Sequence, residues 1–115
     1  MNEALEMTTF RLVSGLSGAD FVNANDDINE YLRRQPGFRW RRIVQDDDGT
    51  ITDIVAWDSA ADGRRSASGI MTEMAGSPVH ATIDHATVDF RIVPVLQYTS
   101  WPRRPYVRRT WSPRS

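Results

Sequence analysis

The sequence has no cysteine, so a disulfide framework, a thiol nucleophile and a cysteine-based zinc site are all excluded. It has no lysine either, and all 14 basic residues are arginines. His80 and His85 are the only imidazoles available for metal, haem or base chemistry. No run approaches the roughly 18 apolar residues that cross a bilayer, and acids stand near the N-terminus where a signal peptide carries basic residues. We therefore expect a cytoplasmic protein without a membrane segment or a metal site.

The 115 residues suit one domain, but the charge is unevenly placed along it. Residues 98–115 contain five arginines and no acid, so a net charge of −1 leaves −6 for residues 1–97. We predict a globular domain over 1–97 and a C-terminal extension over 98–115. Arginines alternate there with four aromatic residues, which also suits nucleic-acid binding. Packing on the acidic domain or on a partner subunit is the favoured interpretation, and nucleic acid is not the expected partner.

The patterning predicts four strands and two helices. Residues 4–13 alternate between two faces as a strand does, with Glu6 and Phe10 on the same face. Apolar residues recur every three or four positions behind a Ser17 cap, which predicts a helix over 18–34. Strands are expected at 38–45, 50–57 and 86–96, a second helix at 60–75, and a short turn at 78–84. This β-α-β-β-α-β order is that of a ferredoxin-like α+β domain with a four-stranded antiparallel sheet.

The Asp-Gly pair at 48–49 marks a hairpin between the second and third strands. We favour a two-residue loop, which pairs Trp40 with Trp57 and puts Arg42 on the same sheet face as Asp53. Since side chains alternate along a strand, a change of one residue in the loop exchanges the two faces of the second strand. A three-residue loop would instead bring to that face Arg39, Arg41 and Ile43.

Asp53 is the most informative candidate for chemistry. It stands between Ile51 and Val55 on one strand face, where a carboxylate is costly to bury unless it is paired or protonated. An ion pair with Arg42 is the commoner outcome. The alternative is an acid–base group with a raised pKa that deprotonates a phenolic or enolisable substrate. His80 is a second candidate base, because the ordinary histidine pKa near 6.5 suits proton transfer.

Four further residues are candidates for ligand binding. Trp40 and Trp57 suit stacking on a planar ligand, although a cross-strand core pair is the alternative for both. Phe21 and Asn25 lie in the apolar stripe of the first predicted helix. Asn25 is either hydrogen-bonded at the edge of the core or presents its amide to a ligand.

Several segments together resemble the dimeric α+β barrel proteins of the antibiotic-biosynthesis monooxygenase-like group. The resemblance extends over about residues 5–97. The matching segments, in chain order, read TTFRLVSGLSGADF, YLRRQPGFRWRRI, DGTITDIVAWDSAADG and IDHATVDFRIVPV. It implies a homodimer whose sheets face each other, with helices outside and a pocket between each sheet and its helices.

The resemblance also bears on the site residues. Trp57 stands at the tryptophan of the W-[DE]-S segment, which lines the substrate pocket in the anthrone-oxidising, cofactor-independent monooxygenases. Those enzymes have an Asn four residues earlier and a Tyr six residues later, where this chain has Asp53 and Gly63. The related haem-degrading proteins use a histidine on the second helix as the iron ligand, and residues 60–75 contain no histidine. No cofactor is therefore expected.

Two functions remain open on this basis. The first is a cofactor-independent oxygenase or related enzyme that acts on an aromatic or polyketide-like small molecule. The second is a non-catalytic dimeric barrel that binds a hydrophobic metabolite or a protein partner. A cavity bounded by Trp57, Asp53, Asn25 and Phe21 would favour the first, and a space filled by Trp40 and Trp57 the second.

Overall fold

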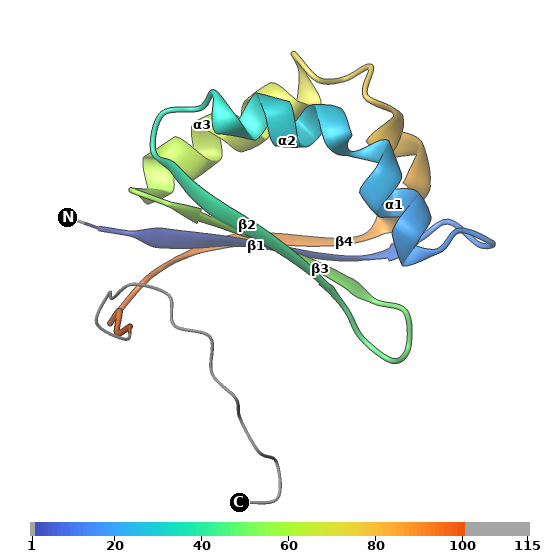
Figure 1. Cartoon of the computed structure of the whole chain (residues 1–115), viewed down its shortest axis with the longest axis horizontal. Coiled ribbons are helices and arrows are strands. Elements are labelled where there is room, and N and C mark those ends of the chain that lie inside the picture. The colour runs from blue at the N-terminus through green and yellow to red at the C-terminus, as the bar shows by residue number, and fades with distance from the viewer. Residues whose placement is uncertain (1, 101–115) are drawn as a thin grey trace, which may run out of the picture.

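The computed structural model describes residues 2–100 and has two layers, an antiparallel sheet and a layer of helices on one of its faces (Figure 1). The sheet has four strands in the order β2-β3-β1-β4, which confirms the predicted ferredoxin-like topology. Predictions about the extension beyond residue 100 lie outside the described residues. The elements in chain order are β1 (Ala4–Leu12), α1 (Gly18–Ala24), α2 (Asp26–Arg33), β2 (Phe38–Gln45), β3 (Ile51–Trp57), α3 (Ala60–Met71), the 3₁₀ helix η1 (Pro78–Thr82) and β4 (Ile83–Pro94).

The single helix predicted over 18–34 is wrong, because the chain breaks at Asn25 into α1 and α2. The Asn25 side-chain amide donates to the carbonyl oxygens of Phe21 and Val22, both at 2.9 Å. An asparagine side chain that bonds the preceding turn competes with the helical backbone and favours a break. Asn25 is itself buried, so this break is fixed in the interior of the protein.

The loop between β2 and β3 has three residues, so the predicted two-residue loop is wrong. The backbone N–H of Asp46 donates to the carbonyl of Thr50, which leaves residues 47–49 as the loop. Gly49 has a φ of 90°, as the last residue of a type I turn with a glycine bulge requires. Because both loop types accept a glycine at this position, the Asp-Gly pair by itself did not distinguish them.

The observed register decides which arginine faces the helices. Arg41 pairs with Val55, so Arg41 shares the helix-covered face with Asp53. Trp40 pairs with Ala56 rather than Trp57 and lies on the opposite face. There the guanidinium of Arg42 lies over the Trp40 ring, 4.6 Å from its centroid. The predicted pairs Trp40–Trp57 and Arg42–Asp53 are therefore both wrong.

Helix α3 packs on the sheet through small residues. Its small residues Gly63 and Ser66 are buried, whereas Ala61 and Met71 are exposed. A Cβ on Gly63 would lie 2.9 Å from Cδ1 of Trp57, closer than packed carbon atoms approach. The glycine, which weakens the helix on propensity alone, therefore lets α3 contact the indole directly. No helix between residues 2 and 100 has the length and apolar character needed to span a membrane.

Candidate functional site

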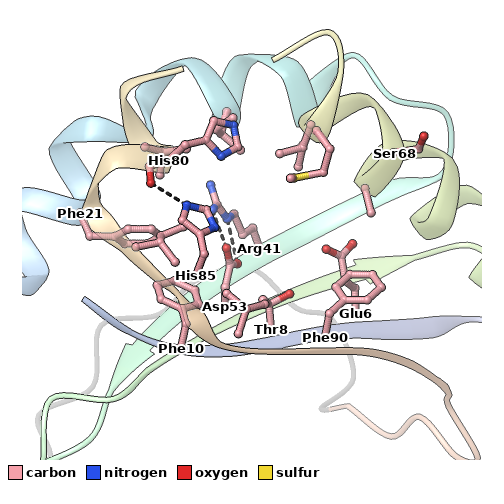
Figure 2. A pocket seen from close by; sticks show the side chains of 17 residues that line it. Glu6, Thr8, Phe10, Phe21, Arg41, Asp53, Ser68, His80, His85 and Phe90 are labelled. Carbon is pink, nitrogen blue, oxygen red and sulfur yellow. Dashed lines mark hydrogen bonds and ion pairs between the residues drawn. The ribbon is translucent and has the colours of Figure 1, made fainter. Parts of the chain in front are cut away.

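A cavity of about 460 Å³ lies between the sheet and the helices (Figure 2). This volume falls within the range of about 300–1,000 Å³ that is usual for small-molecule sites. Most of its wall is apolar, and a few ionisable side chains reach it. The apolar wall includes Phe10, Phe21, Ile28, Ile70, Val79 and Phe90.

A buried ion pair forms one side of this cavity. Nε of Arg41 donates to Oδ1 of Asp53 at 3.0 Å, and Nη2 donates to Oδ2 at 2.6 Å. The Arg41 side chain is only 9% exposed and that of Asp53 16%. The third nitrogen, Nη1, donates to the side-chain oxygens of Asn25 and Asn29. Both oxygens of Asp53 are therefore engaged, and the guanidinium joins β3 to the helix break.

Glu6 is the second carboxylate on the cavity wall. It stands on β1 between Ala4 and Thr8 on the helix-covered face, and only 7% of it is exposed. Nε1 of Trp57 donates to Oε1 of Glu6 at 2.9 Å. Since Trp57 is completely buried, its indole lies behind Glu6 and fixes the carboxyl group from the side away from the cavity.

The burial of Glu6 changes its titration. Removal from water raises its pKa from 4.5 to about 7, and the negative charge of Asp53 adds to the increase. The hydrogen bond from Trp57 and the positive charge of Arg41 act in the opposite direction but do not cancel the effect of burial. Glu6 can therefore exchange a proton near neutral pH, as a general base or acid must.

The two histidines lie on the cavity wall above the sheet. Nε2 of His80 lies 2.9 Å from the carbonyl oxygen of Met74, and Nε2 of His85 lies 2.8 Å from that of His80. A carbonyl oxygen only accepts, so both Nε2 atoms carry a hydrogen, and in the neutral rings Nδ1 is left as the acceptor.

A bulge in β4 brings His85 to this position. Thr9 pairs with Asp89 but Arg11 pairs with Asp84, so β4 has three more residues than β1 between these pairs. The extra residues leave the regular ladder, and His85 and Val88 within this segment contribute to the cavity wall.

The predicted site residues divide into three groups. Phe21, Asp53 and His80 line the cavity. Asn25 and Trp57 are buried just outside its wall, where Asn25 contacts Arg41 and Trp57 contacts Glu6. The remaining two predicted ligand residues, Trp40 and Arg42, lie on the opposite sheet face and do not reach the cavity.

Sequence reasoning missed Glu6 and Arg41. For Glu6 a signal was present, because alternation along β1 placed it on the same face as the apolar Phe10. For Arg41 the signal was ambiguous, since the face on which it lies depends on whether the hairpin loop has an even or an odd number of residues. Within residues 2–100, no three or more His, Asp or Glu side chains are grouped so as to hold a metal ion.

The raised pKa of Glu6 predicts a specific pH dependence of stability. Below pH 4.5 the folded and unfolded states both carry the proton, and above pH 7 both have lost it. Stability is therefore lost as pH rises between these values, by about 3 kcal/mol in total. Glu6→Gln lacks this titration while its side-chain oxygen still accepts from Trp57. In urea unfolding between pH 4.5 and 8, the wild type should lose this stability relative to Glu6→Gln; parallel curves would contradict the assigned pKa.

Neighbouring arginines provide a matched test of the ion pair. Arg41→Lys keeps the charge but not the planar fork, and should lower the free energy of unfolding by about 2–3 kcal/mol. Arg42→Lys changes only an exposed side chain over Trp40 and should cost less than about 1 kcal/mol. Chemical denaturation of both variants measures the difference. Equal losses would show that Arg41 is not the buried connection.

Neither a protein-family model nor a curated protein sequence matches this chain. SnoaB, a cofactor-independent oxygenase from Streptomyces nogalater, matches with a TM-score of 0.65 at 16% identity, over 90% of this chain and 100% of SnoaB. The ActVA-Orf6 monooxygenase of Streptomyces coelicolor, solved with nanaomycin D, matches with a TM-score of 0.65 at 16% identity, over 89% of this chain and 94% of that protein. NE2512, a Nitrosomonas europaea protein of unknown function, matches with a TM-score of 0.60 at 13% identity, over 90% of this chain and 98% of that protein. The chain therefore has the fold of the antibiotic-biosynthesis monooxygenase-like proteins, as the sequence resemblance predicted.

Proposed function

We propose that the protein binds a planar aromatic or polyketide-like molecule in the cavity and oxidises it with O₂ without a cofactor. The observation that carries this proposal is the cavity itself, which has a volume of about 460 Å³ and a mainly apolar wall. Trp40 and Trp57 do not fill this space, whereas a space filled by these two side chains would have favoured the non-catalytic alternative. The similar folds of SnoaB, a cofactor-independent oxygenase, and of the ActVA-Orf6 monooxygenase add support.

The chemistry needs few groups from the protein. An anthrone-like substrate becomes reactive toward O₂ once a base removes a proton from its methylene carbon or from the enol form. One oxygen atom then becomes the new carbonyl oxygen of a quinone, and the other leaves as water with the two methylene hydrogens. An apolar pocket assists because it excludes water and keeps the ionisable groups close to the substrate. Glu6, Asp53 and His80 are the candidate bases on its wall.

The ion pair limits the role of Asp53 in such a reaction. Both of its oxygens already accept from Arg41, and taking up a proton would weaken this two-point pair. We therefore propose Asp53 as a group that orients Arg41 at the cavity wall. His80 stays a candidate base through its Nδ1 atom, which has no hydrogen-bond partner among residues 2–100.

Anthrone provides a direct test of the oxidation. Purified protein with a chelator at neutral pH should consume one O₂ for each quinone formed, above the rate without protein. Ala67→Trp places an indole at the cavity wall and should abolish the activity by filling the space. Arg64→Trp adds the same side chain to an exposed position of α3 and should retain it. Tight binding of anthrone without oxygen uptake would favour the non-catalytic barrel.

We also propose that the chain acts in the cytoplasm as a homodimer formed by the sheet face without helices. The strand registers place Val93, Leu5 and Trp40 in one row across this face, with Ile54 in the next row; these four are partly exposed, while Ala56 between Leu5 and Trp40 is fully buried. These side chains are apolar, and the described helices all lie on the other side of the sheet (Figure 1). An apolar surface of this kind is typical of a protein–protein interface.

Sedimentation velocity tests this arrangement. The wild-type protein should sediment with the mass of a dimer, and Ile54→Glu should sediment as a monomer because a carboxylate is costly to bury at an interface. Val22→Glu, at a half-exposed position of α1, is the control and should remain dimeric. A wild-type monomer, or a dimer in Ile54→Glu, would contradict the proposed interface.

A further inference from the structure

We propose that Glu6 receives the acidic proton of the ligand, so that the cavity selects planar molecules with a phenolic or enolic hydroxyl over their O-alkylated analogues. This inference rests on the ligand class of the proposed function, and it assigns the proton-accepting role to a different residue from Asp53. In the step itself, the O–H bond of the ligand breaks and its proton passes to a carboxylate oxygen of Glu6. The electron pair stays on the ligand oxygen as a phenolate or enolate.

The geometry of Glu6 supports this role. Its Oε1 atom is held by Nε1 of Trp57 at 2.9 Å, and its Oε2 atom has no hydrogen-bond partner among residues 2–100. Because Glu6 lines the cavity, Oε2 is the carboxylate oxygen with capacity to accept from a ligand. Both oxygens of Asp53 already accept from Arg41, so a proton from the ligand would weaken that two-point pair.

The environment of Glu6 also suits proton exchange. The ionisable groups that act on it are Asp53 from β3 and Arg41 from β2, and it acts in turn on Tyr31 from α2. Arg41 and Asp53 neutralise each other, so burial dominates and holds the pKa of Glu6 at about 7. A base with this pKa is ionised in part of the molecules at neutral pH and still has a useful affinity for a proton.

Trp57 acquires a role through this contact. Its indole is fully buried and is absent from the cavity wall, so it does not stack on the ligand. It instead holds the Glu6 carboxyl in a fixed orientation, and the absence of a side chain on Gly63 makes room for the ring. Trp57 is therefore a positioning residue for Glu6.

Ligand selection can be measured without turnover. The probe is 2-hydroxyanthraquinone, which is already a quinone and whose neutral and ionised forms absorb at different wavelengths. Its partner is 2-methoxyanthraquinone, which has the same rings but no hydroxyl proton. At pH 6–7 the wild type should bind the hydroxy compound about tenfold more tightly, the value of one charge-assisted hydrogen bond.

Two variants locate the acceptor. Glu6→Gln keeps an oxygen for Trp57 but turns an N–H₂ group toward the ligand, and should reduce the preference to less than about threefold. Thr8→Val removes a neighbouring hydroxyl on the same strand face without a change in shape, and should keep the full preference. Circular dichroism establishes that both variants fold. Loss of preference in Thr8→Val, or its retention in Glu6→Gln, would overturn the assignment to Glu6.

The absorbance of the bound probe gives a second readout. If the proton of the hydroxyl passes to Glu6, the bound hydroxy compound should show the absorbance of its ionised form at a lower pH in the wild type than in Glu6→Gln. Equal ionisation in the two proteins would contradict contact between Glu6 and the hydroxyl. Trp57→Phe removes a hydrogen bond that lowers the pKa of Glu6, and should shift the pH dependence of binding upward while the preference for the hydroxyl remains.

These results separate the present inference from the proposed oxidation. Selective binding that depends on Glu6, without consumption of O₂ by anthrone, would support the inference and contradict the oxidation. Oxidation of anthrone that persists at the wild-type rate in Glu6→Gln would support the proposed oxidation and contradict the role assigned to Glu6. Failure of the wild type to bind either anthraquinone would overturn the inference directly.

Discussion

One buried guanidinium connects the two layers of this protein at its cavity. Arg41 forms a two-point pair with Asp53 on the sheet and binds Asn25 and Asn29 at the helix break. A charge that is only 9% exposed would cost several kcal/mol if it were left unpaired. The hairpin register that turns Arg41 toward the helices and the break that supplies Asn25 therefore depend on each other.

The two carboxylates on the helix-covered face of the sheet, Asp53 and Glu6, have different environments. Asp53 is committed to Arg41, and the resulting pair is close to neutral. Glu6 has only an indole hydrogen bond and the low polarity of the cavity, so its proton affinity is raised. Neighbouring carboxylates with different environments commonly take different roles in a site. Here the difference follows from which of the two carboxylates Arg41 reaches.

Much of the fold could be read from local patterns. The cap at Ser17 and the alternation of the strands recur in the structure, and the order of elements agrees. The site was harder, because a loop longer by one residue exchanged the two faces of β2 and replaced Arg42 by Arg41. Alternation in β1 had already placed Glu6 on the same face as Phe10, but the sequence around a single carboxylate in a strand does not show whether it is buried.

The sequence by itself determined the order of elements, because capping, turn chemistry and hydrophobic periodicity act over a few neighbouring residues. The tertiary structure alone decided the partners of the polar side chains, since Glu6 and Trp57 are 51 positions apart and meet only when β1 pairs with β3. It also decided that the helix breaks at Asn25, where a side chain that bonds its own backbone binds Arg41 as well. A buried polar group needs a hydrogen-bond partner, and the fold can provide one from a residue far away in the sequence. Local patterns do not show which distant residue that will be.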